Sequence, residues 1–287
     1  MAGTGTSTTD KTAAPPLPER LRVAVADSHT HLDMQSGTVE EALDKAAAVG
    51  VTAVVQVGCD LERSRWAAEV AGRHENVHAT VALHPNEAPR IRREEGPGAL
   101  DAALDEIAAL AALPQVRGVG ETGLDYFRTG ADGIEAQTYS FRRHLRIAKE
   151  VGKALVIHDR DAHQDVLRVL REEGAPGTVV FHCFSGDAAM AEECAAAGYY
   201  MSFAGNVTFK SAQPLRDALA VAPLDLLLVE TDAPFLTPAP YRGRPNAPYL
   251  IPVTLRAMAA VKGVDEDELA TAVAANTARA FGCPPPR

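Results

Sequence analysis

The strongest constraint on the fold of this chain is a regular alternation of strand-length apolar runs with helix-length segments. The runs predict strands at residues 22–26, 51–57, 77–83, 116–120, 154–157, 178–181, 199–203 and 226–229. Segments rich in Ala, Leu, Glu and Arg lie between them, for example at 38–49, 137–151 and 161–173. Near-continuous apolar runs are typical of parallel strands that helices cover on both faces. Eight strands with intervening helices predict a single-domain (β/α)8 TIM barrel of the α/β class.

A doubly wound open sheet is the alternative architecture. No GxGxxG segment follows the first run, which weakens that alternative. Four glycines, Gly50, Gly152, Gly174 and Gly198, each follow a helical segment, as helix-ending glycines do. Two loops stand out, at 84–97 after the third run and at 233–252 after the eighth. Long loops at the carboxyl end of a barrel are usual places for substrate contacts.

Composition limits the class of protein and the expected boundaries. The 287 residues carry a formal net charge of -10, which argues against a general polyanion-coating protein but not against a nuclease with a local cationic site. Residues 1–20 are rich in Thr, Ala and Pro, so we expect a flexible N-terminal tail, a barrel domain at 21–283 and a short C-terminal tail at 284–287. The four cysteines form no CxxC pair, and no apolar run reaches membrane-spanning length. These features predict a cytoplasmic protein with no membrane association and no obligate protein partner.

Metal-ligating residue types recur where five of the predicted strands finish. The candidate ligands are His29, His31, Glu121, His158, His182 and Asp232. A TIM barrel gathers the carboxyl ends of its strands at one face, and closure brings the last strand beside the first. Imidazole and carboxylate ligands together suit Zn, Mn, Co, Ni or Fe, and Mg where oxygen donors suffice. The pattern therefore predicts a metal site that supports hydrolysis.

Each candidate ligand also has a simpler explanation. The histidines are explained equally well as hydrogen-bonded core or rim residues, Glu121 as a salt-bridge partner of Arg117 or Arg128, and Asp232 as a turn-capping residue. The recurrence on successive strands favours the metal site over these separate explanations. Glu230 has the same strand parity as Asp232 and is expected to support a ligand from behind.

Several further residues are candidates for substrate contact. His84 ends the third predicted strand and is expected at the rim of the site. Arg128 follows the fourth strand, and Arg242 and Arg244 lie in the last long loop. Arginine offers bidentate contacts to phosphate, although bracing of the loop is an equally good explanation for the last two.

The motifs together resemble the TatD family of metal-dependent deoxyribonucleases, among the amidohydrolase-like metal-dependent TIM barrels. The resemblance covers roughly residues 22–283 and rests on motifs that follow one another in the family's order: Asp27-Ser-His-Thr-His-Leu-Asp33, Gly120-Glu-Thr-Gly-Leu-Asp-Tyr-Phe-Arg128, Val156-Ile-His-Asp-Arg160, Phe181-His-Cys-Phe-Ser-Gly186 and Glu230-Thr-Asp-Ala-Pro-Phe-Leu236. No lysine stands at the end of the fourth strand, where wider relatives use a carbamylated lysine between their metals.

The resemblance implies two divalent metal ions, Mg, Mn or Zn. One would be held by His29, His31, Glu121 and Asp232, and the other by the bridging Glu121 with His158 and His182. Two segments depart from the family pattern. The loop after the third strand has His84-Pro85-Asn86 where the family usually has His-Pro-His, and the late loop has Gly243-Arg-Pro-Asn246 in place of Gly-Lys-Arg-Asn.

The function that the resemblance implies is hydrolysis of the phosphodiester bonds of DNA, as a 3′–5′ exonuclease, by a metal-bound hydroxide. Asp232 and Glu121 are the expected catalytic residues, and DNA is the expected transient partner. One alternative is a hydrolase of small amides, esters or phosphotriesters, which the acidic charge and sparse aromatic residues mildly favour. Another is a metal-stabilised binding protein without catalysis, against which the complete set of ligands argues.

Overall fold

Eight parallel strands follow one another around a barrel in the order of the sequence. The computed structural model describes residues 12–286. The strands are β1 (Val25–Thr30), β2 (Val51–Val57), β3 (Val77–Val81), β4 (Val116–Asp125), β5 (Ala154–Arg160), β6 (Val179–Phe181), β7 (Tyr200–Phe203) and β8 (Leu227–Val229). The TIM-barrel prediction is thus confirmed, and the open doubly wound sheet is wrong.

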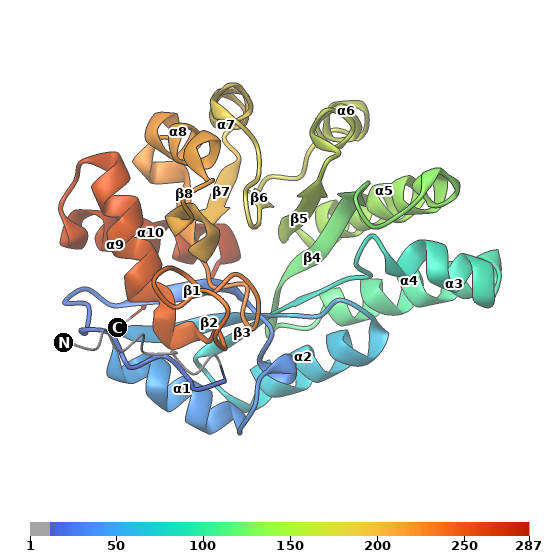
Figure 1. Cartoon of the computed structure of the whole chain (residues 1–287). Coiled ribbons are helices and arrows are strands. Elements are labelled where there is room, and N and C mark those ends of the chain that lie inside the picture. The colour runs from blue at the N-terminus through green and yellow to red at the C-terminus, as the bar shows by residue number, and fades with distance from the viewer. Residues whose placement is uncertain (1–11, 287) are drawn as a thin grey trace, which may run out of the picture.

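Helices surround the strands on the outside of the barrel (Figure 1). They are α1 (Val39–Ala48), α2 (Leu61–Arg73), α3 (Glu87–Glu94), α4 (Pro97–Ala111), α5 (Ile134–Val151), α6 (His163–Glu173), α7 (Ala188–Ala196), α8 (Gln213–Val221), α9 (Ile251–Lys262) and α10 (Glu266–Phe281). Local sequence explains several of their ends. Thr38 and Glu41 form a capping box at the start of α1, and α5 ends at Gly152, which takes the left-handed conformation at φ 66°.

The seam between the last strand and the first is closed by backbone and side-chain hydrogen bonds. Thr30 and Ala233 form a parallel bridge, and the Asp232 amide donates to the His29 carbonyl at 2.9 Å. The buried Asp27 carboxyl accepts from the amide of Thr231 at 2.9 Å and also contacts the Thr231 hydroxyl. These bonds confirm the predicted adjacency of the first and last strands, which brings Asp232 to the histidines of β1.

The inside of the barrel is apolar toward its amino end and polar toward its carboxyl end. Val55 and Val57 of β2, Ala154 and Val156 of β5, Val180 and Leu228 form one buried cluster together with Phe281 at the end of α10. This helix end packs across the amino end of the barrel and completes that cluster. The carboxyl end instead holds buried polar side chains, among them His29, Glu121 and His182.

Three strands run further than the apolar pattern predicts. The first was expected at 22–26, the fourth at 116–120 and the fifth at 154–157, whereas β1 reaches Thr30, β4 reaches Asp125 and β5 reaches Arg160. Polar residues continue these strands because neighbouring backbones go on pairing, as Gly123 with His158 and Asp125 with Arg160. His29, Glu121 and His158 therefore lie inside strands, not beyond them. The expected loop at 84–97 also differs, because it contains α3.

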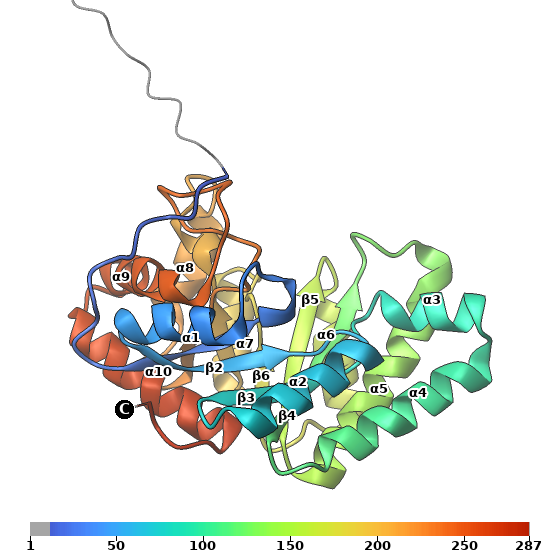
Figure 2. The same ribbon diagram turned by 90° about the horizontal axis from the view of Figure 1, so that it is seen from below.

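Residues 13–15 of the expected N-terminal tail contact the loop that follows β8; residues 1–11 lie outside the described part, and the domain boundaries stay a prediction of the sequence. Arg244 donates to the Ala13 and Ala14 carbonyls at 2.8 and 2.6 Å, and the Tyr249 hydroxyl donates to the Pro15 carbonyl at 2.8 Å. Figure 2 shows this segment, in dark blue, beside the orange loop that follows β8. Carbonyl groups of a Pro-rich segment that makes no secondary structure of its own are satisfied here by side chains of the loop.

Within residues 12–286, none of the helices has the length and apolar character needed to cross a bilayer. The cytoplasmic location and the lack of an obligate protein partner stay predictions of the sequence.

Candidate metal centre

The six predicted ligands meet at the carboxyl end of the barrel. They come from β1, β4 and β5, from the residues that directly follow β1 and β6, and from Asp232, three positions after the end of β8. The carboxylate of Glu121 lies at the centre of the group, between two sets of side chains. Residues separated by more than two hundred positions, such as His31 and Asp232, are thereby brought within contact distance.

The first set faces Oε1 of Glu121. The Nε2 atoms of His29 and His31 lie 3.9 and 3.7 Å from this oxygen, and 3.8 and 3.5 Å from Oδ1 of Asp232. Ligand atoms about 2.0–2.2 Å from a metal ion in tetrahedral or octahedral directions are separated by roughly 3–3.6 Å. The separations here, 3.5–3.9 Å, lie at or slightly above this range, and two imidazole nitrogens with two carboxylate oxygens form a donor set that suits a divalent cation.

The second set faces Oε2 of Glu121. His182 Nε2 lies 2.8 Å from this oxygen, His158 Nδ1 lies 3.2 Å from it, and the two nitrogens are 3.5 Å apart. Each oxygen of one carboxylate therefore points to a different set of imidazoles. This is the arrangement expected of a ligand shared between two ions.

Hydrogen bonds from the opposite nitrogen fix three of the four imidazole rings. The second nitrogen of each lies near an acceptor: His31 Nδ1 is 3.2 Å from the Val57 carbonyl, His158 Nε2 is 3.3 Å from Asp125 Oδ2, and His182 Nδ1 is 3.3 Å from Glu230 Oε1. Since these oxygens accept, the nitrogens must donate, and the nitrogen that faces Glu121 can offer its lone pair. Metal-binding histidines are characteristically oriented in this way.

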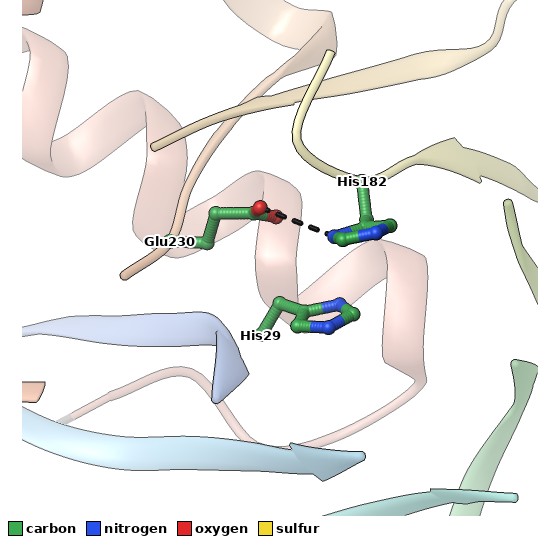
Figure 3. Close-up of side chains that lie close together, drawn as sticks. All are labelled: His29, His182 and Glu230. Carbon is green, nitrogen blue, oxygen red and sulfur yellow. Dashed lines mark hydrogen bonds and ion pairs between the residues drawn. The ribbon is translucent and has the colours of Figure 1, made fainter. Parts of the chain in front are cut away.

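His29 is the exception, because both of its ring nitrogens are buried without a hydrogen-bond partner among the described residues. Its ring stacks on that of His182, with centroids 3.8 Å apart and an interplanar angle of 14° (Figure 3). Burying an unpaired imidazole nitrogen costs free energy that a bound cation would recover. The residues present therefore fit a metal centre.

The charges of the site also favour a cation. Burial by itself lowers the pKa of His182, but the carboxylates of Glu121 and Glu230 raise it well above its ordinary value. Burial likewise raises the pKa of Glu121, and the facing His182 and His158 outweigh this and hold it well below its ordinary value. In the protein without metal, positive charge on the imidazoles thus compensates the buried carboxylate. A metal ion would take over this role.

Asp232 holds an unusual backbone conformation at the mouth of the site. Its φ is 51°, in the left-handed region that non-glycine residues rarely adopt. Its amide is bonded to the His29 carbonyl, and its own carbonyl accepts from the amide of Phe235 at 2.8 Å. Strained residues persist where the surroundings fix them, as here, and such positions often carry function.

Comparison with known proteins identifies the family. The model of the TatD-related DNase family matches residues 26–282. The chain belongs to the TatD family. It is accordingly a metal-dependent hydrolase, as the motifs predict.

Relatives of this TatD-family chain cover most of its length. An uncharacterized metal-dependent hydrolase TatD of Mycobacterium tuberculosis is 46% identical over 90% of this chain and 98% of its own. A 3′–5′ ssDNA/RNA exonuclease TatD of Citrobacter rodentium is 34% identical over 85% of this chain and 91% of its own. The crystal structure of the TatD homologue YJJV of Escherichia coli superimposes with a TM-score of 0.82, at 29% identity, over 91% of this chain and 98% of that one.

Of the residues predicted to contact substrate, His84 lies beside the metal ligands and Arg128 lines a neighbouring cleft. His84 lies beside the second set, its ring 4.5 Å from that of His158, and burial lowers its pKa to about 3. Its Nδ1 accepts from the Asn86 amide at 3.1 Å, so the neutral ring carries its proton on Nε2 and can donate. Arg128 is exposed and lines a cleft of 630 Å³ beside Asn86.

Each of the two late-loop arginines has its guanidinium over an aromatic ring in this structure. The guanidinium of Arg242 lies over the ring of Phe209 at 4.3 Å. Arg244 is occupied by the carbonyls of residues 13 and 14, and its guanidinium also lies 5.5 Å from the Tyr241 ring. For Arg244 the geometry matches the bracing explanation. A role of Arg242 in substrate contact stays a prediction.

Sequence reasoning gave no role to two side chains that touch the ligands. Asp125 holds His158, and its pKa lies below its ordinary value because hydrogen bonds from His158 and the Arg128 amide outweigh the effect of burial. Cys59 Sγ donates to Glu121 Oε1 at 3.3 Å. A signal for Asp125 was available, because it lies four positions after Glu121 on the same strand and so shares its face. Cys59 follows the second strand, where the other strands place their ligands.

Proposed function

We propose that this TatD-family protein hydrolyses phosphodiester bonds of DNA and removes nucleotides from the 3′ end of a single strand. The observation that carries the proposal is the division of the Glu121 carboxylate, whose Oε1 faces His29 and His31 while Oε2 faces His158 and His182. The name of the Citrobacter relative, a 3′–5′ ssDNA/RNA exonuclease, supports the choice of substrate and of polarity.

The proposed centre holds two divalent ions, Mg, Mn or Zn. One is assigned to His29, His31, Glu121 and Asp232, and the other to Glu121, His158 and His182. Such a pair supplies Lewis-acid stabilisation of the phosphoryl oxygens and lowers the pKa of water. The mixture of four imidazoles and two carboxylates suits all three metals and does not favour one of them.

The side chains of this chain orient and deprotonate the reactants. Asp232 is proposed to accept the proton of the attacking water at its carboxylate, which is 15% exposed and therefore in contact with solvent at the mouth. The neutral His84, with its proton on Nε2, is proposed to donate to a phosphate oxygen of the substrate. The cleft lined by Arg128 is proposed to bind the part of the DNA strand beyond the scissile bond, with Arg128 contacting its phosphates.

The test compares the wild-type protein with Asp232→Asn, His182→Ala and Glu121→Gln on oligonucleotides blocked at the 3′ or the 5′ end. We expect cleavage that a 3′ block abolishes and a 5′ block does not. Asp232→Asn should lower kcat by roughly 10²–10⁴-fold. Glu121→Gln should in addition reduce the metal content measured by elemental analysis of the purified protein.

Glu193→Gln is the matched control, because this carboxylate lies on the outer helix α7 and pairs with Arg171. It should keep full activity. Full metal-dependent nuclease activity of Asp232→Asn and His182→Ala would contradict the assignment of the site. Turnover of a panel of small esters and amides, with no cleavage of DNA by the metal-loaded protein, would contradict the proposed substrate.

A further inference from the structure

Two phenylalanine side chains are exposed beside the metal centre. Phe127 is 64% exposed and Phe235 is 52% exposed, although most phenylalanines of the described chain are buried. Phe127 follows Asp125 by two positions, and Phe235 follows Asp232 by three. A phenyl ring left in water forgoes the free energy of burial, so this exposure at a functional site calls for a partner.

The backbone around Phe127 is fixed on both sides. The amide of Tyr126 donates to the Arg160 carbonyl at 2.9 Å, and the amide of Arg128 donates to Asp125 Oδ1 at 2.8 Å. The Tyr126 hydroxyl also donates to Asp165 at 2.8 Å. The ring is therefore presented to solvent by an anchored turn.

Phe235 is held in the same way. Its amide donates to the Asp232 carbonyl at 2.8 Å, and its carbonyl accepts from the Asn246 side chain. Asn246 is buried and donates also to the Thr231 carbonyl at 2.9 Å, which ties the late loop to the end of β8. The Phe235 ring lies 6.3 Å from the ring of His31.

The two rings belong to opposite sides of Glu121. Phe235 lies next to His31, whose Nε2 faces Oε1 of the carboxylate. Phe127 belongs to the turn held by Asp125, which contacts His158 on the Oε2 side. A chain that crosses the metal centre would thus meet one exposed aromatic ring on each side of it.

Arg160 adds positive charge at the Phe127 ring. Its guanidinium lies 3.8 Å from the ring centroid, and within residues 12–286 it has no carboxylate partner. The arginines of the outer helices differ, since Arg142 pairs with two glutamates and Arg171 with one. In an acidic chain, an arginine held over an aromatic ring without a counter-ion remains available to a phosphate.

We propose that Phe127 and Phe235 are stacking platforms for unpaired bases on the two sides of the scissile phosphodiester, and that Arg160 binds the phosphate beside the Phe127 base. This inference rests on the proposed function and assigns its preference for single strands. In a duplex each base face is already stacked, whereas an unpaired base offers its face to an aromatic ring. Although the chain has few aromatic residues, two of them lie where bases would stack.

The test measures binding of a fluorescent single-stranded oligonucleotide with phosphorothioate linkages, and of the same strand with abasic sites at its last three 3′ positions. The proteins are wild type, Phe127→Ala, Phe235→Ala and the stacking-competent Phe127→Trp. Each alanine variant should raise the Kd of the base-bearing strand about tenfold or more, and change that of the abasic strand less than twofold. Phe127→Trp should bind like wild type.

Val221→Ala, at an exposed apolar position of α8 that the site does not use, is the control and should bind like wild type. Arg160→Gln should weaken the binding of both oligonucleotides. It should also reduce the slope of log Kd against log salt concentration by about the amount expected for one phosphate contact. Alanine variants that bind both strands like wild type, or lose equal affinity for both, overturn the inference even when wild type cleaves DNA. A metal-loaded wild type that cleaves no oligonucleotide overturns the proposed function instead.

Discussion

At the scale of the residue, the site depends on which atom of each side chain is left free. His182 and His158 each donate one ring proton to a buried carboxylate and turn the other nitrogen toward Glu121. Glu230 orients the His182 ring, and its Oε1 also accepts a hydrogen bond from the Cys183 amide at 2.8 Å. Burial raises the pKa of Glu230, and His182 moderates that rise.

Glu230→Gln should weaken metal binding without removing a ligand. The side-chain oxygen of glutamine can still accept hydrogen bonds, but the substitution removes the negative charge that raises the basicity of the His182 ring. We expect the affinity for the added divalent metal to fall roughly 10- to 100-fold, measured by calorimetric titration of the chelator-treated protein. Asp105→Asn is the control: this exposed carboxylate pairs with Arg143 between α4 and α5, and the variant should bind metal like wild type. An unchanged affinity would show that Glu230 does not orient His182.

At the scale of the element, the close approach of β4 and β5 brings the side chains of Glu121 and His158 into contact inside the barrel. Glycines permit this approach. A Cβ added at Gly120 would lie 2.4 Å from Cβ of Val156, and one added at Gly123 would lie 2.1 Å from the carbonyl oxygen of His158. Gly123 also has a φ of 139°, which side chains rarely tolerate.

Gly123→Ala should therefore disturb both stability and the metal centre. The backbone conformation alone costs about 1–3 kcal/mol for a residue with a Cβ, and the overlap with a strand carbonyl adds to this. A lower midpoint of urea unfolding together with a lower metal content per protein is the expected result. Gly177→Ala is the matched control, because its Cβ would meet nothing within 4 Å. A Gly123→Ala protein as stable and as metal-rich as the control would refute this account of the strand pair.

At the scale of the whole molecule, buried polar bonds tie the helical layer to the barrel. His144 of α5 is fully buried, its Nε2 accepts from the Leu83 amide at 3.0 Å, and its Nδ1 donates to the Ser140 carbonyl at 2.8 Å. These bonds hold the segment that leads into His84. Burial lowers the pKa of His144 to about 4, so the ring stays neutral where an exposed histidine would be charged.

This shift predicts a loss of stability in acid. Between pH 6.5 and about 4 the unfolded chain binds a proton at His144 that the folded chain does not, so the free energy of unfolding falls as the pH is lowered through this window. The contribution reaches about 3 kcal/mol. Urea unfolding of the chelator-treated protein should show a pH dependence that His144→Gln reduces by this amount. Val221→Ala, at an exposed position of α8 that carries no titratable group, is the control and should leave the dependence unchanged.

The sequence by itself determined the barrel, its order of strands and the six metal-ligand candidates, because these follow from periodicity and from residue type at strand ends. It could not set where polar strands stop: Glu121 and Asp125 lie within β4, since backbone pairing with β5 continues after the apolar pattern has ended. Nor could it decide between bracing and substrate contact for Arg244, which depends on carbonyls 231 and 230 positions away in the chain. Only the tertiary structure decided that the two oxygens of Glu121 face different sets of histidines. The reason is that the direction of a side chain depends on how strands distant in sequence pack together, whereas the type of a ligand residue is given by the sequence at a single position.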